Sequence, residues 1–220
     1  MTEDSASRRL AHSAYRQLED MIFSGKLRGG DVVIERRLAE MLNISRTPLR
    51  DALLMLEGEG LLKRRGARYL EVSEMTVPEF MQILNIRRLL EPEAARLCIG
   101  RIDPMLLADL RDRLRRLAAA TGENQPVSDP DESVLIDKLV HESIADASGN
   151  PLMSNIIRDL RRRTRIFDLG RMTDRVSAAC QEHIDIVVAI EIGDPHAAAA
   201  AMARHIDNFK AAIIQHLSSF

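Results

Sequence analysis

The sequence has 220 residues, of which 45% are hydrophobic, 29% are charged and only 3% are aromatic, and its formal net charge is −2. This balance excludes a disordered polyelectrolyte, and no apolar run approaches the ~20 residues that a membrane-spanning helix needs. The first residues lack an apolar signal core and there are only two cysteines, Cys98 and Cys180, so we expect a cytoplasmic protein with reduced thiols. Without tryptophan, Leu, Ile, Ala and Met must fill the core, which favours packed helices.

The first part of the chain predicts three helices and a hairpin. Apolar residues at helical spacing indicate the helices, Gly25 ends the first, and Ser45 is a suitable N-cap for the third. Two short strand-like runs flank Gly66, as in a hairpin. The predicted elements are helices over 12–24, 35–42 and 46–59 and strands over 61–64 and 69–72.

The remainder of the chain predicts helices only. Asp103-Pro104, Asn150-Pro151 and Asp194-Pro195 each pair an N-cap with a proline at the first helical position. The clearest loop is the stretch 121–132. The expected helices cover about 78–99, 104–120, 132–147, 151–168, 173–192 and 195–218. We therefore expect a mainly α protein with a winged helix-turn-helix domain over 8–74 and an all-α bundle of six to seven helices over 78–218.

The predicted helix-turn-helix carries the residues that duplex DNA would attract. A recognition helix places its N-terminal residues in the major groove, and Arg46 and Arg50 share one face of that helix. Residues 61–70 hold four basic and no acidic residues, so a footprint on DNA would be a small patch near the N-terminus. A solvated surface is the alternative. The candidate DNA-binding residues are Arg36, Ser45, Arg46, Thr47, Arg50, Lys63, Arg65 and Gly66.

Four metal-binding side chains fall on helical faces of the second part. Asp137 and His141 are four residues apart, and His183 and His205 lie on apolar stripes of two later helices. Nitrogen and oxygen donors of this kind suit zinc, nickel or manganese, and zinc is common. The alternative is that the histidines are satisfied core residues. A metal-dependent hydrolytic enzyme also stays open, because such a site can activate water, although no general base or catalytic motif accompanies it.

Short motifs in both parts resemble a known family, the GntR family of bacterial transcription regulators. The first part resembles its DNA-binding domain through LA at 38–39, SRTPLR at 45–50, LExxGL at 56–61 and the wing glycine Gly66. Residues 80–209 resemble the FCD ligand-binding domain of the FadR subfamily through RxxLE at 87–91, DxxxH at 137–141, ASGN at 147–150, EHxxI at 182–186 and ARHI at 203–206. The wing departs from the usual form, since Arg64-Arg65 stands where a proline often precedes the glycine region.

The resemblance implies a ligand-responsive regulator, most often a repressor, that binds a palindromic DNA operator as a homodimer. In metal-binding members one Asp and three His at the positions of Asp137, His141, His183 and His205 hold a divalent ion, here expected to be zinc. Arg87 lies on the apolar face of its helix, and the resemblance implies that it binds a small carboxylate effector. Pairing of Arg87 with a protein carboxylate is the alternative, and a purely structural metal without an effector also stays open.

Overall fold

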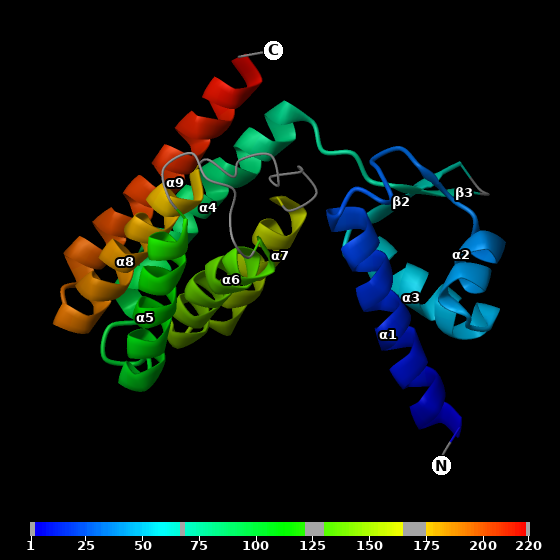
Figure 1. Ribbon diagram of the computed structural model, residues 1–220, viewed down its shortest axis with the longest axis horizontal. Coiled ribbons are helices and arrows are strands. Elements are labelled where there is room, and N and C mark those ends of the chain that lie inside the picture. The colour runs from blue at the N-terminus through cyan, green and yellow to red at the C-terminus, as the bar shows by residue number, and fades with distance from the viewer. Residues whose placement is uncertain (1–2, 67–68, 122–129, 165–174, 219–220) are drawn as a thin grey trace. The chain divides into compact units, whose positions relative to one another are not determined.

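The computed structural model describes residues 3–66, 69–121, 130–164 and 175–218, which form two compact units (Figure 1). One is built mainly from residues 3–77, and the other from the helices that follow. The described part of the chain is mainly helical with one small sheet, which confirms the predicted fold class. None of its helices combines the length and the apolar character that crossing a bilayer requires.

The first unit contains three helices and a three-stranded antiparallel sheet. The helices are α1 (Glu3–Phe23), α2 (Glu35–Leu42) and α3 (Arg46–Gly58), and the strands are β1 (Val32–Val33), β2 (Leu62–Arg65) and β3 (Tyr69–Val72), in the order β1-β3-β2. The hairpin prediction is confirmed, with Lys63 opposite Glu71 across β2 and β3. Strand β1 was not predicted, because two residues are too few to show the alternation of a strand.

Helix α1 begins nine residues before the predicted start at His12. Its buried positions are Ala11, Ala14, Leu18 and Ile22, and the described side chains before Ala11 are exposed or half-buried. An amphipathic pattern indicates a helix only where one face is buried, so the first turns of α1 could not be predicted from it. The buried stripe of α3 is confirmed, since Leu49, Leu53 and Leu56 are all at most 2% exposed.

The turn between α2 and α3 is tight because Asn43 adopts a left-handed conformation, with φ of 51°. Asparagine tolerates this conformation better than most residues, and its N–H caps α2 through the carbonyls of Ala39 and Glu40. Ser45 stands at the N-cap of α3 as predicted, but its hydroxyl makes no capping hydrogen bond. The Ser45 hydroxyl is therefore left exposed at the start of α3.

The second unit is built from six helices among the described residues. They are α4 (Val77–Leu97), α5 (Pro104–Ala120), α6 (Pro130–Ala147), α7 (Pro151–Thr164), α8 (Val176–Ile192) and α9 (Pro195–Ser218). Helix α5 packs along α8, and α8 packs along α9. The predicted end of the fourth helix of this part, near 168, and the predicted start of the next, at 173, lie outside the described residues, as does most of the loop 121–132.

The three predicted N-caps of this unit are confirmed. Asp103 accepts a hydrogen bond from the N–H of Met105, Asn150 accepts one from Met153, and Asp194 accepts from the N–H groups of His196 and Ala197. Cys98 and Cys180 are buried and free, and burial raises the pKa of each thiol to about 11.

Replacing Asp103, the N-cap of α5, tests whether its hydrogen bond stabilises the helix. Asp103→Ala is expected to lower the free energy of unfolding by about 1 kcal/mol, because a helix N–H loses its acceptor. Asp109→Ala is the matched control, since Asp109 lies inside the same helix and only approaches Arg113 at 3.8 Å; it should change stability by less than about 0.5 kcal/mol. Chemical denaturation measures both, and equal effects would contradict the capping role.

Candidate metal centre and nucleic-acid interface

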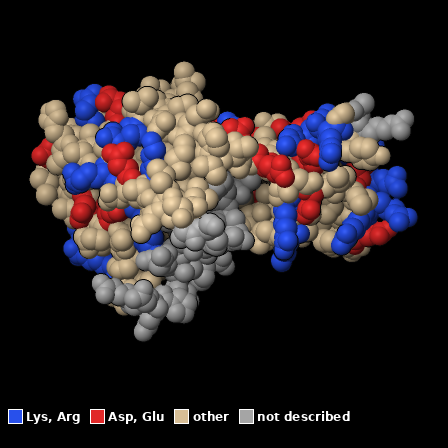
Figure 2. Space-filling view, turned by 90° about the horizontal axis from the view of Figure 1, so that it is seen from above, with Lys and Arg blue, Asp and Glu red and all other residues tan. Residues whose placement is uncertain are grey.

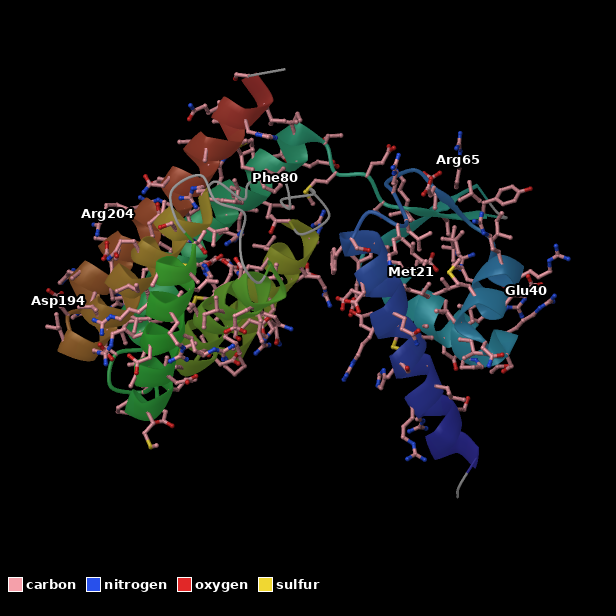
Figure 3. All side chains as sticks on the ribbon, in the orientation of Figure 1. Met21, Glu40, Arg65, Phe80, Asp194 and Arg204 are labelled. Carbon is pink, nitrogen blue, oxygen red and sulfur yellow. The ribbon has the colours of Figure 1, made fainter. Side chains whose placement is uncertain are left out.

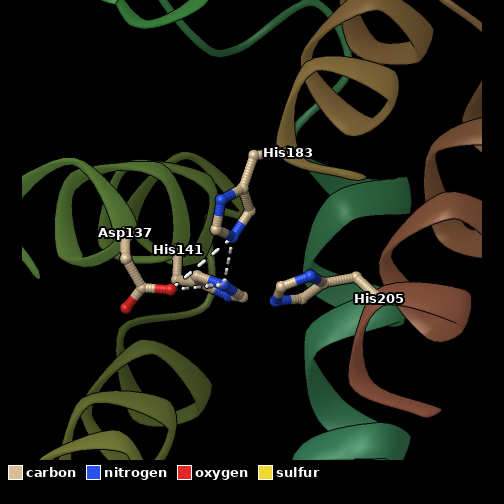
Figure 4. Close-up of side chains that lie close together, drawn as sticks. All are labelled: Asp137, His141, His183 and His205. Carbon is tan, nitrogen blue, oxygen red and sulfur yellow. Dashed lines mark hydrogen bonds and ion pairs between the residues drawn. The ribbon is translucent and has the colours of Figure 1, made fainter. Parts of the chain in front are cut away.

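Asp137, His141, His183 and His205 come together in the second unit (Figure 4). Asp137 and His141 project from α6, His183 from α8 and His205 from α9, and one donor atom of each lies within 4.8 Å of the others. The Nε2 atoms of His141 and His183 are 3.1 Å apart, and Asp137 Oδ1 lies 3.7 and 3.6 Å from them. The structure thus brings together the four side chains that the sequence analysis singled out as metal-binding candidates.

The donor set fits a divalent ion. Two atoms bound to one ion at about 2.0–2.2 Å cannot lie more than about 4.4 Å apart, so only a small closure is needed. The three imidazoles are 1–5% exposed, whereas the side chain of Asp137 is 46% exposed. The Nε2 atoms of His141 and His183 face each other within hydrogen-bond distance, and a cation between them would accept a lone pair from each.

Two carboxylates contact histidines of the cluster through their Nδ1 atoms. The Nδ1 of His141 is hydrogen-bonded to buried Glu91 on α4, and the Nδ1 of His205 is 2.8 Å from Glu182 on α8. An Nδ1–H that donates to a carboxylate leaves Nε2 as the lone-pair atom, which is the usual arrangement behind a metal-bound histidine. Both glutamates belong to the motifs RxxLE and EHxxI, but neither was predicted to have a role.

Two guanidinium groups also reach this centre. Arg87 donates from Nε to Glu91 at 2.6 Å, and Arg161 on α7 donates to Asp137 at 2.5 Å. For Arg87 the structure thus shows the alternative that the sequence left open, a pair with a protein carboxylate. The side chain of Arg161 is only 11% exposed, and its guanidinium group contacts Asp137.

The electrostatics favour neutral imidazoles and ionised carboxylates. Burial, followed by the charge of Arg161, lowers the pKa of His141 to about 4, and burial lowers the pKa of His183 well below its usual value. Burial alone would raise the pKa of Glu91, but Arg87 and then His141 outweigh it and hold this pKa well below the usual range. At neutral pH the two histidines therefore present unprotonated nitrogens, the form in which a metal ion binds them.

The candidate DNA-binding residues all belong to the first unit, and all are exposed. They are Arg36 on α2, Ser45, Arg46, Thr47 and Arg50 at the start of α3, and Lys63, Arg65 and Gly66 in the hairpin. Gly66 has a φ of +65°, a conformation that glycine adopts without strain. Figure 3 shows Arg65 extending away from the ribbon at the hairpin.

Several of these cations are paired with acidic side chains. Arg50 Nε lies 2.9 Å from Glu35, and Lys63 and Arg65 lie 3.3 and 3.6 Å from the same residue, Glu71. Figure 2 likewise shows Lys and Arg interspersed with Asp and Glu rather than gathered in one continuous patch. The Arg50–Glu35 pair is exposed and contributes little stability, so phosphate can replace Glu35 at low cost.

Comparison with known proteins identifies both units. Residues 10–69 match the family of bacterial regulatory proteins named gntR, and residues 82–208 match the FCD domain. The chain belongs to the GntR family. The resemblance stated from the motifs is thereby confirmed, including the FCD domain that places the chain with FadR-type members.

Individual relatives agree with this assignment. The chain is 30% identical over 143 residues to the uncharacterised regulator YdhC of Bacillus subtilis, a match that covers 65% of this chain and 62% of YdhC. The solved structure of McbR/YncC of Escherichia coli superposes with a TM-score of 0.79 at 23% identity, covering 94% of this chain and 98% of that one. A structure described as the metal-free FCD domain of TM0439 gives a TM-score of 0.56 at 17% identity, covering 67% and 100%. Curated relatives of this chain are named as transcription regulators.

Proposed function

We propose that this GntR-family protein is a DNA-binding transcription regulator, acting as a repressor, that a small organic acid controls through a metal centre. The observation that carries the proposal is the convergence of three buried imidazoles and one carboxylate in the FCD domain, with a carboxylate behind two of the imidazoles. The description of the TM0439 domain as metal-free supports it, because that wording distinguishes a form without the ion from a form with it.

The DNA-binding part is assigned to residues 8–74 and the effector-binding part to residues 78–218. We assign groove and phosphate contacts to the exposed polar residues at the start of α3 and in the hairpin: Arg36, Ser45, Arg46, Thr47, Arg50, Lys63, Arg65 and Gly66. Since one such unit reads a short sequence, a homodimer on a palindromic operator supplies the length that specific recognition needs.

The metal centre is assigned to Asp137, His141, His183 and His205. Zinc fits this donor set best, with nickel and manganese as the other candidates. When bound, the ion supplies a positive charge and coordination for a carboxylate, while this chain's residues hold and orient the imidazoles. Arg87 and Arg161 lie beside the centre, where each is paired with a carboxylate, Glu91 and Asp137 respectively.

Two measurements test the proposal together. Metal analysis of the purified chain should find about one divalent ion per chain, and fragments of the source genome should include some that the protein retards in a gel at physiological salt. Protein without stoichiometric metal, even after addition of zinc, would contradict the metal centre. Equal affinity for scrambled duplexes would contradict sequence-specific binding.

Arg50→Ala and Lys63→Ala are expected to change DNA binding in different ways. Loss of a base contact by Arg50 should remove about 1–3 kcal/mol of discrimination at one position of each half-site. Loss of a phosphate contact by Lys63 should weaken all duplexes similarly and reduce the slope of log K against log salt by about 1. Selection from a random duplex library, repeated at several salt concentrations, measures both quantities.

The control for this pair is Arg96→Ala, because Arg96 is an exposed arginine of the second unit and pairs only locally with Glu93. It should leave both the selected sequence and the salt slope unchanged. Uniform weakening of all duplexes by Arg50→Ala, as expected for Lys63→Ala, would show that Arg50 does not read a base.

A structural ion without an effector is the second candidate, and one observation favours it: Arg87 is already neutralised by Glu91. It predicts that small organic acids leave the melting temperature of the zinc-loaded protein unchanged. A true effector raises it by mass action.

A further inference from the structure

The arginine to which a base contact is assigned is held by a carboxylate from the neighbouring helix. Arg50 Nε lies 2.9 Å from Glu35 Oε2, and Glu35 is the first residue of α2, 15 positions before Arg50. Helices α2 and α3 pack against each other on either side of the turn at Asn43. A carboxylate in the first turn of a helix is favoured by the helix dipole, so Glu35 lies where a negative charge is stabilised.

The contact with Glu35 occupies one edge of the guanidinium group and leaves its far end available. Glu35 accepts from Nε of Arg50, and among the described residues no hydrogen bond or ion pair of Arg50 involves Nη1 or Nη2. The side chain of Arg50 is 61% exposed. Because the guanidinium group is planar and its N–H donors have a fixed arrangement, holding Nε also restricts the direction of the two Nη atoms.

The other candidate arginines of α2 and α3 are not held in this way. Arg46 lies one turn before Arg50 on the same helical face, and within the described residues no acidic partner is found for it. Arg36 approaches Glu40 only at 3.8 Å, which is too long for a hydrogen bond. Among these candidates, in the part of the chain that the structure describes, Arg50 alone is fixed by a hydrogen bond to a carboxylate.

We propose that Glu35 is a positioning residue for base recognition, which holds Nε of Arg50 so that Nη1 and Nη2 meet O6 and N7 of one guanine in the major groove. This inference rests on the proposed function, which assigns a base contact to Arg50. Bidentate pairing of arginine with guanine is the commonest specific contact to DNA. An arginine that is ordered before binding loses less side-chain entropy in the complex, and this advantage is gained only where the correct base accepts both hydrogen bonds.

Two other arrangements compete with positioning. A phosphate can replace Glu35 against Arg50, and Glu35 then has no influence on base preference. Alternatively, the Glu35 carboxylate can leave Arg50 and accept a hydrogen bond from N4 of a cytosine, and Glu35 then acts at a position of its own. Both require the pair to separate, whereas positioning keeps the hydrogen bond of the free protein and uses the exposed end of Arg50.

The experiment measures base preference with the full-length chain. Duplexes are selected from a random library with the wild type, and affinities are then measured for the selected duplex and for each of its single-base variants. Arg50→Ala identifies the position that Arg50 reads. Glu35→Ala should reduce the preference for the selected base at that same position about threefold to tenfold, because Arg50 is no longer held, and should leave the preference at other positions unchanged.

Glu35→Gln separates positioning from charge, since its amide oxygen accepts a hydrogen bond from Nε but carries no charge. Both variants remove one negative charge from the start of α2 and should bind all duplexes more tightly, but only Glu35→Ala should lose the preference at the Arg50 position. Glu40→Ala is the matched control, because Glu40 is exposed on the same helix and lies against Arg36 rather than Arg50. It should keep the wild-type preference at the Arg50 position, and circular dichroism confirms that each variant folds.

The outcomes separate this inference from the function on which it rests. Failure to select any sequence, or uniform weakening of all duplexes by Arg50→Ala, contradicts the proposed base recognition and overturns the inference with it. Wild-type preference of Glu35→Ala at a clear Arg50 position overturns the inference alone, and so does an equal loss in Glu35→Ala and Glu35→Gln. A loss of preference at a different position shows that Glu35 reads a base itself, which also overturns positioning.

Discussion

His183→Ala is expected to abolish stoichiometric zinc binding while the helices of the second unit remain folded. His183 lies inside the cluster, because its Nε2 is 3.1 Å from that of His141 and 3.6 Å from Asp137. Removing a residue that merely supports a ligand typically costs 10–100-fold in affinity, so loss of a ligand should cost more than about 100-fold. Competition with a chromogenic chelator measures this affinity.

His196→Ala is the matched control, since His196 is an exposed histidine at the start of α9, far along the helix from His205. It should bind zinc as the wild type does. The stabilisation that zinc gives the wild type should also disappear in His183→Ala, because an ion stabilises only a state that binds it. Unchanged zinc affinity in His183→Ala would rule out the proposed centre.

Arg87→Met is expected to destabilise the second unit by about 3–5 kcal/mol. The change leaves the carboxylate of Glu91, which is 2% exposed, without the guanidinium that lies 2.6 Å from it. Breaking a buried ion pair from one side is costly because the remaining charge stays in a poorly solvated position. Urea denaturation of metal-free protein measures the loss without a contribution from the ion.

Arg88→Met supplies the comparison one residue further along α4. Arg88 pairs with Asp207 at 2.8 Å, but both side chains are about half exposed, so its loss should cost less than about 1 kcal/mol. The double change Arg87→Met with Glu91→Leu should recover part of the penalty, because it removes both charges of the buried pair. Similar costs for Arg87→Met and Arg88→Met would show that burial of the Arg87 pair is unimportant.

Local signals in the sequence were enough for most of the helices. The caps at Asp103, Asn150 and Asp194 depend on residues two or three positions away, and the buried stripe of α3 depends on a period of 3.6 residues. Such rules fail where the interaction is not local or the segment is too short. Strand β1 has two residues and is defined by its partner β3, almost forty positions later in the chain.

The same distinction applies to the site. Motif resemblance was enough to select the four metal-binding candidates, whereas the residues that hold them had to be seen in three dimensions. Glu91 reaches His141 across 50 positions and Arg161 reaches Asp137 across 24, and no periodicity connects such pairs. Glu91 stands four residues after Arg87, a spacing that places both on one helical face, and this was the one available signal for that pair.

The hairpin has a further consequence for how the protein approaches a duplex. Glu71 is only 9% exposed and lies beneath both Lys63 and Arg65, so these three side chains together present one unit of positive charge rather than two. When a phosphate attracts one of these two cations away from Glu71, the other cation no longer shares the Glu71 carboxylate and therefore binds it more tightly. In the proposed complex with DNA, Lys63, Arg65 and Glu71 therefore attract phosphate with one net positive charge between them.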